Sequence, residues 1–260
     1  MKYLLIILST LLISCDDNPL GKTSLSSCDH SPNTNVGLPL TCQVSIPFTE
    51  NMFSWLDAHD SGTLELQNQT QVVNWFDKSG NGTNLTLISG THATQKKKSS
   101  NERNAILFNS AEGGYSTGFG MANFPPNQSF TMGISLKTGT FSSKSFELSN
   151  NDPAGFKFTV DTNGNLTYSS GTIQNVATGI SLQTNTVYKF IITYDQSVPS
   201  MTITNGLSIN YTGAAPATSN SWIELLITGS ESFEINEILI YTALPEAQDI
   251  QKYLDNKWGF

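Results

Sequence analysis

Short runs of alternating apolar and polar residues recur along most of the chain, and Gly, Asn and Asp separate them. The alternation is clearest at Phe156–Val160, which leads through Asp161–Gly164 into another run. Asn205-Gly206 lies between two such runs, which is a strong signal for a hairpin. The pattern predicts strands at Ala105–Phe108, Phe130–Lys137, Phe156–Val160, Asn165–Tyr168, Val187–Tyr194, Met201–Thr204, Leu207–Tyr211, Trp222–Thr228 and Phe233–Tyr241.

Helical periodicity is convincing only near the end of the chain. Ala247, Ile250, Leu254 and Trp258 form one apolar stripe, and Pro245 suits a first helical position. Many short strands and a single terminal helix predict an all-β protein, a two-sheet antiparallel β-sandwich with one short C-terminal helix. We expect Trp55, Trp75 and Trp258 to lie in its core.

The first residues have the layout of an export signal. Met1-Lys2 is followed by an apolar run from Tyr3 to Ile13, too short to span a bilayer stably. The end of this run, Leu12-Ile13-Ser14-Cys15, resembles a bacterial lipobox, which implies cleavage before Cys15 and lipidation of that cysteine. The alternative is an ordinary signal peptide with a coincidental cysteine. We therefore expect a signal peptide at residues 1–14, a lipidated tether at 15–47 and one domain at 48–260.

Two further cysteines, Cys28 and Cys42, lie within the tether. In an exported chain such a pair indicates a disulfide across a short polar loop. Two free thiols, or a metal pair with His30, are the alternatives.

The charge of the chain limits its partners. Formal net charge is −8, so nucleic acid is an unfavourable ligand. The one basic run, Lys96–Lys98, reads as a solvated loop, with contact to an anionic surface as the alternative.

We expect localisation in the cell envelope, anchored through Cys15 to a bacterial membrane at the periplasmic face or the cell surface.

Three segments together resemble a known family. They are WLDAHD at Trp55–Asp60, VVNWFDKSGNG at Val72–Gly82, and EILIYTALPEAQDIQKYLDNKWGF at Glu237–Phe260. This set is similar to the concanavalin A-like, LamG-like jelly-roll domains of bacterial surface proteins, and the likeness covers roughly residues 48–260. The departure is Leu244-Pro245, where that family more often has Leu-Ser. The resemblance implies architecture, since the fold hosts lectins, adhesins, glycanases and structural modules.

Candidate hydrolytic motifs are incomplete. Gly114–Gly118 matches G-x-S-x-G around Ser116, but no helix-forming segment follows it and all three histidines precede it. A retaining glycanase needs two facing carboxylates. Strand alternation places Glu234 and Asn236 on one face and Glu237 on the other, so this strand supplies no pair. We expect no catalytic residues.

A calcium site is the remaining candidate for a bound ion. Asp77, Ser79 and Asn81 follow the spacing of an EF-hand loop, but Ile88 stands where a bidentate glutamate is needed. We expect Asp77 and Asn81 to satisfy the backbone of the turn instead. Weak calcium candidates are Asp77, Asp57 and Asp60, and no cofactor is otherwise expected.

The sequence favours a non-enzymatic binding or adhesion module for a glycan or a surface protein. The alternatives are a glycan-active hydrolase and a purely structural envelope protein. Sugar binding usually needs an exposed aromatic platform. The candidates for it, which the sequence does not rank, are Tyr115, Phe119, Phe124, Tyr168, Tyr211 and Trp222.

Overall fold

The computed structural model describes most of the predicted domain. The described residues are 46–89, 93–97, 99, 103–108, 114–116, 128–141, 146–149, 155–170, 173–206, 208–214, 226–229, 233–245 and 247–258. Cys15, Cys28 and Cys42 lie outside these ranges, so the predicted signal, lipid anchor and disulfide do too.

The described residues form strands, two short 3-10 helices, Thr49–Asn51 and Ser61–Thr63, and one α-helix. The first strands are β1 (Met52–Asp57), β2 (Leu64–Gln67), β3 (Gln71–Trp75), β4 (Leu85–Ser89), β5 (Thr94–Lys96), β6 (Ala105–Phe108), β7 (Gly114–Ser116) and β8 (Phe130–Lys137). The later elements are β9 (Phe146–Ser149), β10 (Phe156–Val160), β11 (Asn165–Ser170), β12 (Ile173–Ser181), β13 (Val187–Asp195), β14 (Ser200–Asn205), β15 (Ser208–Ala214), β16 (Leu226–Gly229), β17 (Phe233–Tyr241) and α1 (Ala247–Trp258).

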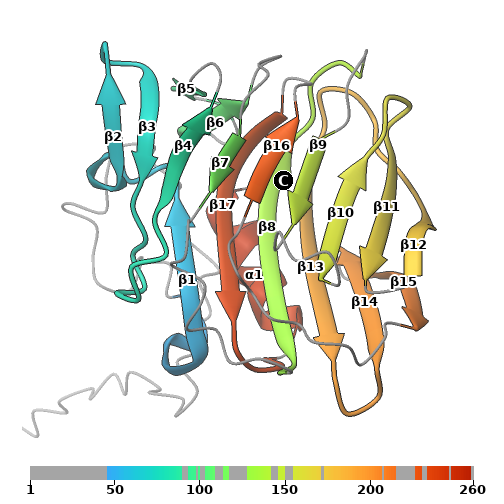
Figure 1. Cartoon of the computed structure of the whole chain (residues 1–260). Helices are drawn as coiled ribbons and strands as arrows, with labels where there is room; N and C mark the ends of the chain where they lie inside the picture. The colour runs from blue at the N-terminus through green and yellow to red at the C-terminus, as the bar shows by residue number, and fades with distance from the viewer. Residues whose placement is uncertain are drawn as a thin grey trace, which may run out of the picture.

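The strands pair antiparallel and lie in two layers (Figure 1). In one layer, which we call the helix layer, β17 lies between β8 on one side and β1 and β6 on the other, and β13, β14 and β15 follow β8. The opposite layer has the order β4–β7–β16–β9–β10–β11–β12. Pairing of β3 with β4 and β5, and of β5 with β6, connects the two layers along one side. The predicted two-sheet antiparallel sandwich is confirmed.

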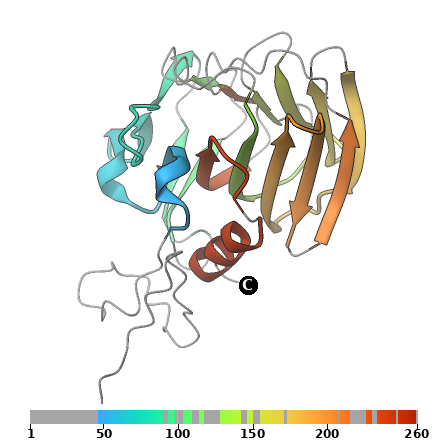
Figure 2. The same cartoon turned by 90° about the horizontal axis from the view of Figure 1, so that it is seen from below.

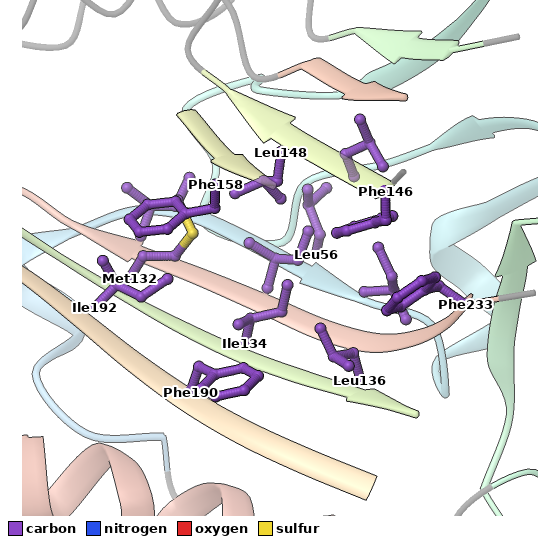
Figure 3. Packing of buried hydrophobic residues seen from close by; sticks show 14 of the residues in the cluster. Leu56, Met132, Ile134, Leu136, Phe146, Leu148, Phe158, Phe190, Ile192 and Phe233 are labelled. Atoms are coloured by element: carbon purple, nitrogen blue, oxygen red, sulfur yellow. The ribbon is translucent and has the colours of Figure 1, made fainter. Parts of the chain in front are cut away.

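The core lies between the layers because alternate residues of each strand point inward. In β8, the inward positions Met132, Ile134 and Leu136 pack against Leu148 and Phe158 of the opposite layer (Figure 3). Trp75 belongs to this core, as predicted. The two-residue period of the strands therefore builds one continuous apolar interior.

A second apolar cluster fills the space beneath the helix. Helix α1 lies across the outer face of the helix layer (Figure 2). Its Ile250, Leu254 and Trp258 pack on Ile191 and Leu239, which point away from the sandwich core. Every residue of β17 is buried. The predicted helix stripe and the inward position of Trp258 are confirmed.

A glycine allows the helix to approach the sheet closely. A Cβ added at Gly133 of β8 would lie 2.8 Å from Ile250 Cγ2 of α1. Any side chain at this position would force Ile250 to shift, because that distance is shorter than real contacts allow.

Several sequence expectations differ from the structure, and β12 and Trp55 are two examples. Strand β12 was not expected, because its apolar residues do not alternate regularly, and positive φ angles at Asn175 and Gly179 accompany register shifts against β11. Trp55, expected in the core, lies at the rim of the cluster beneath the helix and is only partly buried. Among the described residues, no helix is long and apolar enough to cross a membrane.

Candidate functional site

The three segments that carry the family resemblance meet on the outer face of the helix layer. Strand β1 brings Trp55 and Asp57, the loop after β3 brings Lys78, and β17 brings Glu237. The last turns of α1 add three side chains to the same place. We call this set the Glu237 cluster, and its members are Trp55, Asp57, Lys78, Glu237, Tyr253, Lys257 and Trp258.

Glu237 is fully buried, and its carboxylate accepts hydrogen bonds from four side chains. Oε1 accepts from Trp55 Nε1 at 2.8 Å, Tyr253 Oη at 2.8 Å and Lys257 Nζ at 2.7 Å. Oε2 accepts from Trp258 Nε1 at 2.6 Å. A buried carboxylate is tolerated only with such donors and a cation, so the cluster fastens α1 and β1 to β17.

Asp57 faces Glu237 directly, because the two residues are partners across the β1–β17 pairing. Like charges at opposed positions repel, and Lys257 neutralises them by bridging both. Its Nζ lies 2.9 Å from Asp57 Oδ2 and 2.7 Å from Glu237 Oε1. Lys78 adds a second cation at 3.2 Å from Asp57 Oδ2 and also pairs with Asp60 at 2.9 Å.

These lysines control the ionisation of Asp57. Burial by itself raises the pKa of the carboxyl, but the charges and hydrogen bonds of Lys257 and Lys78 outweigh burial and lower the pKa to about 2. As a free carboxyl group, Asp57 is therefore ionised at physiological pH.

The segment Asp77–Gly82 clamps β1 through its side chains. Asp77 Oδ1 accepts from the backbone N–H of Trp55 at 2.7 Å and of Ser79 at 2.9 Å. Asn81 Nδ2 donates to the carbonyl oxygens of Met52 at 3.1 Å and Phe53 at 3.0 Å. Gly80 and Gly82 adopt positive φ angles, which lets the chain turn between these contacts.

The calcium candidates have partners of their own. Asp57 is paired with two lysines, and Asp60 Oδ1 accepts from the backbone N–H of Gly62. Asp77 Oδ2 accepts from Ser79 Oγ at 2.6 Å. Across the described part of the chain, no group of three or more His, Cys, Asp or Glu residues is arranged to hold a metal ion.

The expected positions of Glu234 and Glu237 on opposite faces were wrong. The pairing of β17 with β8 shifts between Ile235 and Glu237, so Asn236 forms a β-bulge. The extra residue reverses the alternation and places Glu234 and Glu237 on the same outer face. Glu234 there accepts from Lys96 Nζ and Ser99 Oγ, so a hairpin between β5 and β6 is also fastened to β17.

The structure brings together a carboxylate pair that the sequence did not reveal, Asp57 and Glu237 on neighbouring strands. The pair is not laid out for glycoside chemistry, because the residues are 4% and 0% exposed and share a lysine. A glycan-cleaving pair must face a cleft with room for the sugar. Lys257 and Tyr253 were also missed; their four-residue spacing beside the apolar stripe of α1 was the available signal.

The rim of the cluster carries two further basic residues, Arg103 and His59. Arg103 lies over the Trp258 ring, with Cζ at 6.0 Å from the ring centroid, and His59 meets the same ring edge-on at 6.4 Å. Burial lowers the pKa of His59, and the charge of Arg103 lowers it further. The imidazole is therefore neutral at pH 7.

Two of the aromatic candidates for sugar binding pack in or against the core. Tyr168 is buried and donates to the carbonyl oxygen of Ala214 at 2.7 Å, and Tyr211 donates to the Tyr168 hydroxyl at 3.1 Å. The side chains of Tyr115, Phe119, Phe124 and Trp222 lie outside the described residues. Among the described residues, the large apolar side chains that are exposed are Phe76, Val198 and Leu244.

Comparison with known proteins supports the fold. No protein family and no curated protein matches this sequence. Domain 4 of AbnA, a GH43 extracellular arabinanase from Geobacillus stearothermophilus in complex with arabinotriose, is similar over 78% of this chain and 98% of that domain, with 14% identity and a TM-score of 0.58.

Two larger proteins share the architecture. The binding domain of botulinum neurotoxin DC in complex with SialylT matches 81% of this chain, with 11% identity and a TM-score of 0.59. A mutant of Trypanosoma rangeli sialidase displaying trans-sialidase activity matches 82%, with 12% identity and a TM-score of 0.56. The chain spans 52% and 34% of these two proteins. At such identities the likeness establishes a β-sandwich of jelly-roll type and nothing finer.

Replacing Glu237 by Gln tests the role of the cluster. The change removes the charge that Lys257 needs, so we expect the free energy of unfolding to fall by about 3 kcal/mol in urea denaturation. Glu147→Gln is the matched control, because Glu147 makes a surface ion pair with Lys157 at 3.5 Å, and we expect less than about 0.5 kcal/mol there. Equal losses in the two variants would contradict the assignment.

The depressed pKa of Asp57 predicts a pH dependence of stability. The folded pKa of about 2 lies below the ordinary value of 3.8, so the charged form stabilises the fold. This contribution, about 2 kcal/mol, is complete above pH 4 and is lost as pH falls through 2. Urea denaturation at several pH values should show that the free energy of unfolding falls less steeply with decreasing pH in Asp57→Asn than in the wild type. An equally steep fall in the variant would refute the role of Asp57 in this pH dependence.

Proposed function

We propose that this chain is a lipid-anchored protein of the bacterial cell envelope whose β-sandwich binds carbohydrate without cleaving it. The observation that carries the proposal is the likeness to AbnA domain 4, a complete small domain that was solved with arabinotriose bound. That likeness covers nearly all of the smaller domain, whereas the sialidase is matched over only about a third of its length. A module that binds glycan is thus a better analogue than an entire enzyme.

The state of the acidic residues supports the non-catalytic part of the proposal. General acid and base roles need two carboxyl groups that reach the substrate and differ in pKa. The opposed pair Asp57 and Glu237 is buried and bridged by Lys257, and Glu234 is bonded to Lys96 and Ser99. These carboxylates are bonded to side chains of the same chain and do not face a substrate, which favours glycan binding over glycan hydrolysis.

Glycan binding can be measured with the detergent-solubilised full chain on an array of neutral and sialylated oligosaccharides that includes arabinan fragments. We expect saturable binding with no release of reducing ends. Phe76→Ala is the first variant to compare, because Phe76 is the exposed aromatic residue among the described large apolar side chains, and Val198→Ala is its matched control. Cleavage would establish a hydrolase, and absence of any binding would favour a structural envelope protein.

The anchor has a separate test. Cells expressing the full chain should incorporate labelled palmitate into it, because Cys15 follows a lipobox-like run. The Cys15→Ala variant should lose the label, and Cys28→Ala should retain it. An unlabelled wild-type chain, or label that persists in Cys15→Ala, would rule out lipidation at this cysteine.

A further inference from the structure

The Glu237 cluster places an amine between two carboxylates in a site closed to solvent. Lys257, Asp57 and Glu237 are 6%, 4% and 0% exposed. The rings of Trp55, Tyr253 and Trp258 surround the ammonium group, with centroids 5.8, 5.5 and 5.2 Å from Nζ. The three ionisable residues come from three different elements, so only the folded chain assembles them.

We propose that Lys257 and Asp57 condense in the folded protein to form an intramolecular amide bond. The bond joins Lys257 Nζ to the carboxyl carbon of Asp57 and releases one Asp57 oxygen as water. No oxidant or co-substrate takes part, because an ammonium group and a carboxylate together contain the atoms of one amide and one water molecule. The bond joins α1 to β1 covalently, near the two ends of the described chain.

The neighbouring groups can move the protons that this reaction requires. Glu237, whose Oε1 lies 2.7 Å from Nζ, takes a proton from the Lys257 ammonium group and passes it to an Asp57 oxygen, so that a neutral amine meets a neutral carboxyl group. The amine nitrogen then attacks the Asp57 carbon. Glu237 takes a second proton from the nitrogen and delivers it to the departing hydroxyl, so Glu237 ends as a carboxylate and water leaves.

Two donors are placed to hold the charge that builds on the Asp57 oxygens. The backbone N–H of His59 donates to Oδ1 at 3.1 Å, and Lys78 Nζ lies 3.2 Å from Oδ2. Fixed donors of this kind stabilise tetrahedral intermediates in acyl transfer. Holding amine and carboxyl in contact also gives an effective concentration that reaches about 10⁵ M or more in well-oriented systems.

The ionic ground state makes the reaction slow. The charges of Lys257 and Lys78 outweigh burial and keep the Asp57 carboxyl ionised, with a pKa of about 2, and an anion resists attack by an amine. The reaction therefore passes through the minor state in which the ammonium proton has moved, by way of Glu237, to the Asp57 carboxyl. The stability changes expected for Glu237→Gln and Asp57→Asn refer to the chain before this bond forms. We expect a single maturation step after folding, not a turnover reaction.

The chain contains an internal comparison. Lys189 and Asp255 also form a lysine–aspartate pair beneath α1, at 3.1 Å, but the Asp255 side chain is 35% exposed. Water reaches that carboxyl, so we expect no amide there.

Peptide mapping by mass spectrometry of the purified full chain tests the proposal directly. The expected result is one cross-linked peptide that carries Asp57 and Lys257 and is lighter by one water than the two separate peptides. A peptide linking Lys189 to Asp255 should be absent. Detection of only uncoupled Asp57 and Lys257 peptides, after prolonged incubation of the folded chain, would overturn the proposal.

Variants assign the roles within the reaction. Lys257→Arg keeps the charge but lacks the amine, so the cross-linked peptide should disappear, whereas Lys189→Arg should retain it. Glu237→Gln should slow its formation at least tenfold, provided that circular dichroism shows a folded chain. If Glu237→Gln does not fold, the wild-type map still decides between bond and no bond. If a folded Glu237→Gln chain formed the cross-link at the wild-type rate, proton transfer by Glu237 would be refuted.

Discussion

The need to satisfy one buried carboxylate, that of Glu237, governs the arrangement of the helix layer. A fully buried acid has to find hydrogen-bond donors and a cation, and here they come from two elements far apart in the chain, β1 and α1. The indole of Trp55 ties it to β1, and Tyr253, Lys257 and Trp258 tie it to α1. Lys257 in turn neutralises Asp57, which recruits Lys78 from the loop after β3. The apolar packing beneath α1 supplies attraction, whereas these directional contacts specify where the helix ends and how β1 is aligned.

The bulge at Asn236 makes this arrangement possible. Without the extra residue, inward positions would continue from Phe233 and Ile235 in steps of two, and Glu237 would point into the apolar interior. With the bulge, Ile238 and Ile240 take the inward positions, and Glu237 joins Glu234 outside. The bulged residue is held in place, since its carbonyl oxygen accepts from Ala58 N–H at 3.0 Å and its side chain donates to Ser135. A local irregularity of this kind re-aims a functional or structural side chain.

The regular strands and the helix could be predicted from the sequence because their apolar residues recur with the period of a strand or of a helix. Strands β6, β8, β10 and β17 coincide with the predicted ranges, and the stripe on α1 is buried as expected. The Glu237 cluster could not be predicted in the same way. Its three motifs were recognisable, but the bulge at Asn236 has no glycine or other backbone signal in the sequence. The opposition of Asp57 and Glu237 depends on a pairing between strands that are far apart along the chain. Periodicity describes one element at a time, whereas the cluster is a property of several.

The clamp formed by Asp77, Ser79 and Asn81 has a consequence for the behaviour of the chain among its neighbours. In the described structure β1 pairs with β17 alone, so its other side is an edge of the sheet. Exposed edges offer unpaired amide and carbonyl groups to strands of other molecules and promote aggregation. The clamp occupies these groups at Met52, Phe53 and Trp55 with side-chain and backbone partners of its own. The motif therefore leaves fewer unpaired backbone groups on this edge of β1 for a strand of another molecule to bind.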